Sequence, residues 1–274
     1  MAAHDANLAE IWMAAWSLGL EWSSDRRGYR GMGRYNMQNA WRLDHVLARA
    51  ASRGIYLHLT LDNHGKLALG SDPEWNESPF NALTGFAKAD GGFLRRPADF
   101  FTDAQAARYT AQRNRYIVAR WGQDPTLFGV ELWSEGNLVD DFQELYRRGT
   151  IIRWTERVAT ELRDAGLRQM VTTHFCGNYE NNVKFRKLQD LPQIDYIVGD
   201  GYRDRDIPMT RLLRLQDEAL RFTGKPRLIT EYGGSWAGAS HDALEADIHV
   251  GLWGSLFAQQ AGTPMLWWHG LIHY

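Results

Sequence analysis

Short runs of β-branched and aromatic residues alternate with amphipathic helices along the whole chain, and this order constrains the fold more than any other feature. It predicts parallel strands, because a helical crossover has to carry the chain back before the next parallel strand begins. We expect seven strands, at residues 9–14, 55–61, 127–133, 169–174, 196–199, 227–230 and 264–268. We expect longer helices at residues 37–53, 103–121, 151–165, 209–222 and 241–261. No linker rich in Pro, Gly or Ser interrupts the pattern, which predicts a single domain over residues 1–274.

Seven strands with crossovers fit either a doubly wound sheet or an eight-stranded barrel that lacks one strand. A doubly wound sheet usually has a Gly-rich turn after its first strand, whereas the loops after the strands here are long and aromatic, as at the C-terminal face of a barrel. The expected fold class is therefore α/β, a (β/α)8 TIM barrel. We expect it to be truncated, with the first strand–helix unit and the last helix missing, because the chain begins and stops close to strands. Open sheet edges would then favour self-association.

Several helix ends are marked by residues that cap helices. Thr102 is the expected N-cap of the helix that begins at Asp103, because a Thr side chain can accept hydrogen bonds from the first free N–H groups. Gly166 and Gly224 follow the expected ends of two helices, where glycine adopts the left-handed conformation that terminates a helix.

Composition excludes several classes of function. The chain has 274 residues with 31 Lys and Arg against 33 Asp and Glu, so no basic surplus is present to bind nucleic acid. No apolar segment is long enough for a membrane span, and we expect no membrane association. The single cysteine, Cys176, cannot form an intrachain disulfide. We expect no cofactor and no metal, because the histidines, such as His45, His58 and His64, show no metal-ligand spacing.

Two apolar strands run directly into glutamates. Residues 127–133 lead to Glu135, and residues 227–230 lead to Glu231 and the pair Gly233 and Gly234. An acidic residue is costly in a core but expected where a barrel strand ends at an active-site mouth. Glycoside cleavage needs two such carboxylates, about 5 to 5.5 Å apart in retaining enzymes. Glu135 and Glu231 are the predicted catalytic residues.

Three strings carry a resemblance to a known family. They are ELWSE at 131–135, LITEYGG at 228–234 and PMLWWH at 264–269, and they resemble the fourth, seventh and eighth strands of clan A glycoside hydrolases. The nearest resemblance is to family 5 enzymes of the cellulase and mannanase type. WMAAWSLGLEW at 12–22 and LHLTLDNHG at 57–65 are similar to the second and third strands of these enzymes, so the resemblance covers most of the chain.

The resemblance implies a retaining hydrolase of β-linked poly- or oligosaccharides, with Glu135 as acid/base and Glu231 as nucleophile. Tyr202 would hydrogen-bond the nucleophile, and Trp267 or Trp268 would stack under the sugar. The full set of expected substrate-binding residues is Trp12, Trp16, His64, Trp133, Ser134, His174, Tyr202, Trp236, Trp267 and Trp268. The expected partner is a carbohydrate. The sequence leaves the localisation unknown, although the resemblance suggests a secreted or periplasmic full-length protein.

Two residues depart from the family pattern. Ser134 stands where these enzymes usually have an Asn that binds the sugar 2-hydroxyl, and Glu10 stands where they tend to have an Arg that supports the ionised nucleophile. A carboxylate close to the nucleophile would raise its pKa. An alternative is therefore a catalytically impaired carbohydrate-binding protein of the same fold. A third reading, a metal-dependent isomerase or a phosphate-binding lyase, has only the glycines at 233–234 in its favour.

Overall fold

The computed structural model describes residues 2–83, 91–203 and 207–267. The chain divides into two compact units, Met1–Val171 and Thr172–Tyr274, each of which is described by itself. In the part of the chain that the model describes, no helix is both long and apolar enough to cross a membrane.

The first unit is built on a parallel sheet in the order β1-β2-β3-β4. Its strands are β1 (Leu8–Trp12), β2 (Tyr56–Thr60), β3 (Leu127–Glu131) and β4 (Met170–Thr172). β2 pairs in parallel with both β1 and β3, and the register places Glu10 beside His58 and Thr60 beside Glu131. The carboxyl ends of these strands therefore lie at one edge of the sheet, where polar side chains gather.

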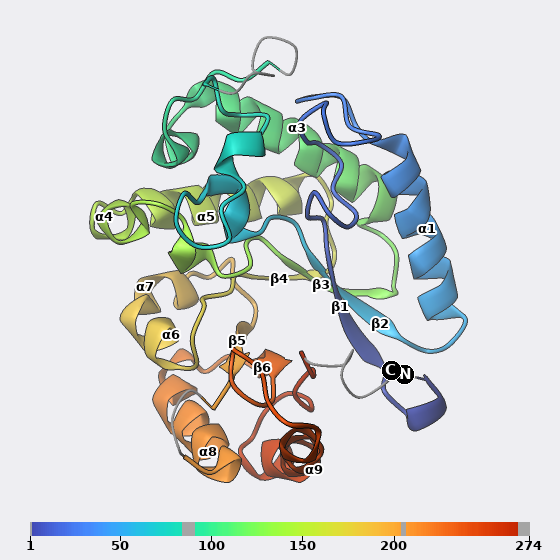
Figure 1. Ribbon diagram of the computed structural model, residues 1–274, viewed down its shortest axis with the longest axis vertical. Helices are drawn as coiled ribbons and strands as arrows, with labels where there is room; N and C mark the ends of the chain where they lie inside the picture. Colours follow the sequence, from blue (N-terminus) through green and yellow to red (C-terminus); the bar gives the residue numbers. More distant parts are fainter. Residues whose placement is uncertain (1, 84–90, 204–206, 268–274) are drawn as a thin grey trace. The chain divides into compact units, whose positions relative to one another are not determined.

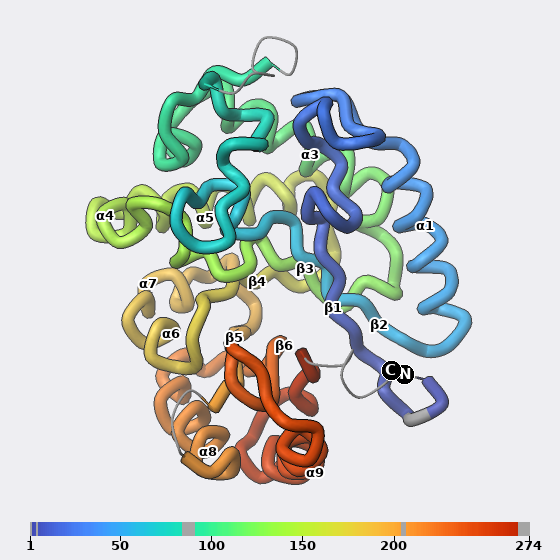
Figure 2. The backbone as a smooth tube through the Cα atoms, in the orientation of Figure 1, coloured from blue at the N-terminus to red at the C-terminus, as the bar shows by residue number. Residues whose placement is uncertain are grey.

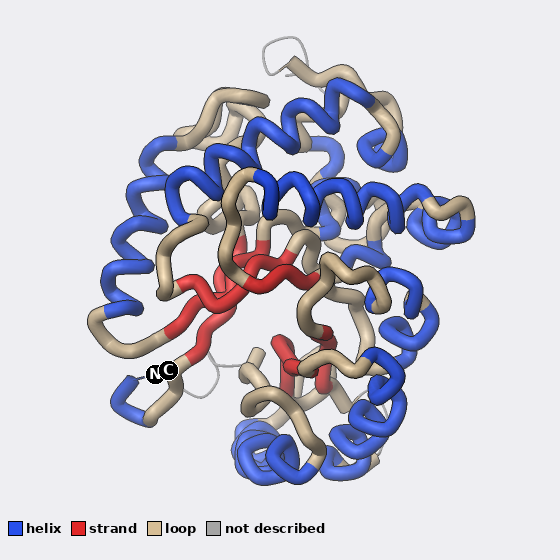
Figure 3. Tube along the Cα trace, turned by 180° about the vertical axis from the view of Figure 1, so that it is seen from behind, coloured by secondary structure: helices blue, strands red, loops and turns tan. Residues whose placement is uncertain are grey.

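Helices α1, α3 and α5 cover one face of this sheet (Figures 1 and 3). The helices of the first unit are α1 (Met37–Ala51), α3 (Ala104–Trp121), α4 (Phe142–Arg147) and α5 (Thr150–Asp164). The 3-10 helices are η1 (Ala2–His4), η2 (His64–Leu67), η3 (Trp75–Glu77), η4 (Pro97–Phe101) and η5 (Gly136–Leu138). Figure 2 shows the long connection between β2 and α3, which contains η2, η3 and η4.

The cap of α3 differs from the prediction. Asp103, not Thr102, is the N-cap, and its carboxylate accepts hydrogen bonds from the N–H groups of Gln105 and Ala106. Asp and Thr both cap well, and here the aspartate also brings a negative charge to the positive end of the helix dipole. The predicted glycines are in place, since Gly166 and Gly224 both have positive φ angles just after helices.

The second unit contains a two-stranded parallel sheet of β5 (Ile197–Gly201) and β6 (Arg227–Tyr232). Its helices are α6 (Glu180–Lys184), α7 (Arg186–Gln189), α8 (Met209–Leu220), η6 (Arg221–Thr223) and α9 (His241–Phe257). Met209, Leu212 and Leu213 of α8 pack against Ile229 and Tyr232 of β6 to form the core of this unit. The amphipathic pattern of α8 thus buries one side of the helix on the sheet and leaves the other polar.

Six of the seven predicted strands are confirmed, with ends that differ by at most two residues. In the predicted strand at 264–268, the described residues form an isolated bridge, Leu266 with Tyr232, and residue 268 lies outside the described range. The predicted helices are confirmed as well, although α9 ends at Phe257 and not at residue 261.

A buried ion network lies at the end of β2 in the first unit. The guanidinium of Arg113 donates two hydrogen bonds to the Asp62 carboxylate, at 2.7 and 2.6 Å. The ammonium of Lys66 donates a third, at 2.6 Å. All three side chains are less than one tenth exposed. This network, Asp62, Lys66 and Arg113, fixes α3 to the segment that follows β2.

Candidate active site

Glu135 lies in a strained turn just after β3. Its backbone has φ 51° and ψ 39°, the left-handed conformation that side chains other than glycine rarely adopt. Its carboxylate is 17% exposed and lies 3.2 Å from Nδ1 of His64, whose Nε2 lies 3.4 Å from the carboxylate of Asp72. Backbone strain of this kind persists only where surrounding contacts impose it, and it clusters at functional sites.

The two residues before Glu135 are buried. The Ser134 side chain is inaccessible, and its backbone N–H donates to the Asp62 carbonyl at 2.8 Å. Trp133 is 4% exposed and packs against Phe100, Phe101 and Trp154 at ring-centroid distances of 5.7 to 5.8 Å. Trp133 is therefore a core residue, and its buried ring offers no surface for the substrate contact we expected of it.

Trp12 and Trp16 lie together after β1, with ring centroids 5.7 Å apart, and Trp16 is 59% exposed. The indole N–H of Trp12 donates to the carboxylate of Glu10, which also accepts from the Thr60 hydroxyl at 3.2 Å. Glu10, the residue that departs from the family pattern, thus orients Trp12. The exposed indole of Trp16, supported by the partly buried Trp12, suits the stacking of sugar rings.

Beside this pair, Glu131 of β3 is fully buried. It lies 3.4 Å from Nε2 of His58 and accepts from the Thr60 hydroxyl at 3.3 Å. These contacts give Glu131 a structural role inside the sheet.

Glu231 of the second unit is held at the end of β6. The hydroxyl of Tyr202, which follows β5, donates to Oε2 of Glu231 at 2.8 Å, and both residues are less than one tenth exposed. This is the hydrogen bond that the resemblance predicts. A charge-assisted bond of this type stabilises the ionised carboxylate, which is the form a nucleophile needs.

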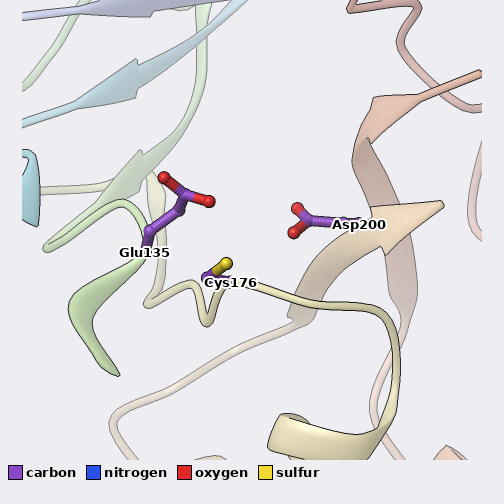
Figure 4. Close-up of side chains that lie close together, drawn as sticks. All are labelled: Glu135, Cys176 and Asp200. Carbon is purple, nitrogen blue, oxygen red and sulfur yellow. The ribbon is translucent and has the colours of Figure 1, made fainter. Parts of the chain in front are cut away.

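A histidine–aspartate pair lies beside Glu231. Nε2 of His174 is 2.6 Å from Oδ1 of Asp200, and both side chains are 1% exposed. The other Asp200 oxygen accepts from the Gly177 N–H at 2.8 Å. Figure 4 draws Asp200 on β5 and Cys176 on the loop after β4, and it draws Glu135 on its turn after β3. Three atoms that could ligate a metal, one each from His174, Asp200 and Glu231, lie within 4.8 Å of one another.

The sequence analysis missed Asp200, although it follows the rule that found the glutamates. The run Tyr196-Ile-Val-Gly199 leads directly into this acid, just as other strands lead into Glu135 and Glu231. The expected strand ended at Gly199, whereas β5 continues to Gly201 and includes Asp200.

The same three side chains could in principle bind a metal, since each offers one ligand atom in a buried cluster. Their atoms already take part in the His174–Asp200 and Tyr202–Glu231 hydrogen bonds. Coordination through those same atoms would displace these hydrogen bonds, so the arrangement favours a hydrogen-bonded network.

The remaining predicted aromatic residues follow β6. Trp236 lies in the loop after β6 and is 72% exposed. Trp267 is 40% exposed, and its backbone N–H donates to the Tyr232 carbonyl at 3.1 Å, which ties the residue to the end of β6. Trp268 lies outside the described residues.

No family model matches the chain, but individual proteins do. The chain is 28% identical to mannan endo-1,4-beta-mannosidase 4 of Oryza sativa subsp. japonica over 187 residues, 65% of this chain and 36% of that protein. It is 21% identical to mannan endo-1,4-beta-mannosidase 2 of Arabidopsis thaliana over 290 residues, 92% of this chain and 66% of that protein. The chain thus matches about a third of the first relative and just under two thirds of the second.

The solved structures that resemble this chain include proteins of the same kind, mannanases and mannosidases. The endo-1,4-beta-D-mannanase of Thermotoga petrophila RKU-1, solved with maltose and glycerol, matches 97% of this chain and 81% of its own with a TM-score of 0.64 and 15% identity. A mutant family 5 mannosidase of Rhizomucor miehei in complex with mannosyl-fructose matches 97% of this chain and 73% of its own, with a TM-score of 0.67 and 14% identity.

The α/β fold of parallel strands is that of the family 5 (β/α)8 barrels, and the predicted fold class is confirmed. The predicted resemblance to clan A, family 5-like glycoside hydrolases is confirmed as well. The particular proteins that the chain resembles are mannanases and mannosidases.

Proposed function

We propose that this protein is a retaining glycoside hydrolase of β-linked polysaccharides, with Glu231 as nucleophile and Glu135 as acid/base. The observation that carries the proposal is the hydrogen bond from Tyr202 to Glu231, because it favours an ionised carboxylate at the end of a buried strand. The strained turn at Glu135 and its contact with His64 support the second role, since the residue is held in one conformation at a polar site.

In the proposed reaction, Glu135 protonates the leaving glycosidic oxygen while Glu231 attacks the anomeric carbon and forms a covalent glycosyl-enzyme. Glu135, now ionised, removes a proton from water as the water oxygen attacks the anomeric carbon. The bond between that carbon and Glu231 then breaks, which releases the sugar and restores the Glu231 carboxylate and the protonated Glu135. Trp12 and Trp16 in the first unit, and Trp236 and Trp267 in the second, offer indole surface for the sugar rings. His64 positions Glu135 and completes the proposed acid/base side of the site.

β-1,4-linked mannan is the substrate to test first, because both relatives are named as mannan endo-1,4-beta-mannosidases. The direct test is incubation with an activated 2-fluoro mannoside, which traps the covalent intermediate. Mass spectrometry should find the adduct on Glu231, and a Glu231→Gln variant should take up no label. Turnover with inversion at the anomeric carbon, or a label on another residue, would contradict the assignment.

The alternative of a carbohydrate-binding protein without turnover has one observation in its favour. Ser134 replaces the expected Asn, and its side chain is fully buried, so a weaker contact to the sugar 2-hydroxyl is expected at that position. Isothermal titration calorimetry with mannan oligosaccharides, run beside the labelling and hydrolysis assays, distinguishes a binding protein from a hydrolase. Binding without adduct or hydrolysis across a panel of β-linked substrates would favour the binding protein.

A further inference from the structure

His174, Asp200 and Glu231 form a buried group of three titratable side chains, called here the His174 triad. The three residues are 1 to 4% exposed, and one atom of each lies within 4.8 Å of the other two. Two carboxylates this close in a buried site disfavour each other's ionised form, so that one of them tends to keep its proton. An imidazole in the same group can relieve this repulsion by carrying the proton itself.

We propose that His174 and Asp200 are positioning residues that keep Glu231 ionised, with His174 present as the imidazolium. The short contact of 2.6 Å between Nε2 and Asp200 fits an N–H donor facing an ionised carboxylate. The triad then carries one positive and two negative charges, and Glu231 retains its negative charge for attack on the sugar. This inference rests on the proposed role of Glu231, and it replaces the sugar contact expected of His174.

The charge that acts on Glu231 in this proposal comes from within the second unit. In the second unit, the positive charge next to Glu231 would come from His174, at the end of β4, with Asp200 of β5 holding it in place.

Other titratable groups lie around the triad within the second unit. Tyr202 donates to Glu231, and a ligand atom of Cys176 lies within 4.8 Å of one of Asp200. Arg203 and Asp247 of α9 form an ion pair at 3.0 Å, and Asp247 also accepts from the Gly234 N–H after β6. Because the Arg203–Asp247 pair is internally balanced, it contributes little net charge at Glu231.

A set of three variants tests the proposal: His174→Gln, Asp200→Asn and the double variant. Glutamine keeps a donor for Asp200 but removes the positive charge. The measured quantity is the titration of the Glu231 carboxyl, followed by NMR on protein labelled with ¹³C at the glutamate carboxyls and assigned with Glu231→Gln. This measurement needs no turnover, and it is run beside the pH profile of kcat/KM on mannan.

His174→Gln should raise the Glu231 midpoint by about one unit or more, because Asp200 then faces Glu231 without the imidazolium. The acidic limb of the kcat/KM profile should move to higher pH by the same amount. Asp200→Asn should leave the midpoint at or below that of the wild type. The double variant should return the midpoint toward the wild-type value, since it removes the remaining carboxylate of the pair.

The pattern across the variants decides the outcome. If His174 had only a structural role, the Glu231 midpoint would be shifted at least as far in the double variant as in His174→Gln. That result would overturn the inference. An unchanged Glu231 midpoint in His174→Gln would overturn it as well, even if the enzyme turns over. If the midpoints shift as expected while the wild type neither hydrolyses nor takes the 2-fluoro label, the proposed function fails and the charge coupling stands.

Discussion

The buried ion network of the first unit and the His174 triad of the second both take carboxylates out of water, but they compensate them differently. Asp62 contacts two basic side chains, Arg113 and Lys66, through three hydrogen bonds of 2.6 to 2.7 Å. The triad places two carboxylates, Asp200 and Glu231, around one imidazole. The first arrangement is rich in positive charge and the second in negative charge.

The two cations act on the pKa of the Asp62 carboxyl. Burial acts to raise the pKa of its carboxyl, but Arg113 and Lys66 outweigh burial and hold the pKa below its usual range. Glu21, close to the same cations, shows the opposite balance, because burial raises its pKa more than Arg113 and Lys66 lower it. Direct contact with two cations thus outweighs burial at Asp62, whereas the more distant charges of the same cations do not outweigh it at Glu21.

The difference suggests a division of roles between the two regions. A fully paired carboxylate contributes to stability and is chemically inert, whereas one that shares its counter-charge with another acid is poised to change its protonation state. Charge removed from the network should therefore reduce stability. Removal of a carboxylate charge from the triad should reduce activity without reducing stability.

The largest expected effect is that of Asp62→Asn. The variant leaves Arg113 and Lys66 buried without their anion, which should lower the free energy of unfolding by about 3 to 5 kcal/mol. Urea unfolding at neutral pH measures the loss. The matched control is Asp44→Asn, which breaks the half-exposed pair with Arg120 and should cost about 0.2 to 1 kcal/mol. Equal losses in the two variants would show that burial of the Asp62 pair adds nothing.

Because of the same network, part of the free energy of unfolding should be sensitive to acid. The part lost at low pH should be at most as large as the loss caused by Asp62→Asn. The folded pKa of Asp62 is lowered from its ordinary value of 3.8, so its contribution is present above about pH 3.8 and is lost as the pH falls through the folded pKa. The difference in unfolding free energy between the wild type and Asp62→Asn should be constant from pH 7 to 5 and narrow below pH 3.8. The raised pKa of Glu21 acts in the opposite direction, and Asp62 is one of the charges that raise it, so the comparison is repeated in a Glu21→Gln background to isolate Asp62. If the difference in unfolding free energy between the two proteins did not change between pH 5 and 2.5, the lowered pKa of Asp62 would be contradicted.

On the side of the triad, Tyr202→Phe should reduce activity. It removes a hydrogen bond to a charged group, worth about 1.5 to 3 kcal/mol, and should lower kcat/KM on mannan by about 10- to 100-fold. The control is Tyr232→Phe in the same unit, whose hydroxyl donates to the backbone carbonyl of Asp247 and not to a carboxylate. That variant should keep its rate, and parallel losses in both would point to general damage to the second unit.

The two regions also differ in how far the sequence predicted them. Glu135 and Glu231 could be found because an apolar strand that runs into an acid is a local pattern. Asp200 obeys the same pattern and was missed, because the end of a short strand is uncertain by a residue or two and β5 extends past its predicted end.

Contacts between distant residues were beyond the local pattern. Asp62 and Arg113 are 51 residues apart, and His174 and Asp200 are 26 apart, so their pairing follows from the register of the fold and from no sequence period. Trp133 was among the expected substrate-binding residues, but in the structure its ring packs against Phe100, Phe101 and Trp154. Packing against the helices decides which side chains face the core. Nearness in sequence to a catalytic residue gives no information about that packing.

The smallest expected effect has the opposite sign to the first, and for that reason it tests the comparison most directly. Glu231→Gln replaces one of the two clustered carboxylates with a neutral side chain of nearly the same shape, which can still accept the Tyr202 hydrogen bond. Since the repulsion with Asp200 is removed, the free energy of unfolding should rise by about 0.5 to 2 kcal/mol, the usual range when an active-site strain is relieved. Thermal and urea unfolding of this variant beside Asp62→Asn would give two substitutions of buried acids by their amides with opposite effects on stability. A loss of stability in Glu231→Gln comparable to that in Asp62→Asn would mean that Glu231 is as well compensated as Asp62, and the distinction between the two regions would fail.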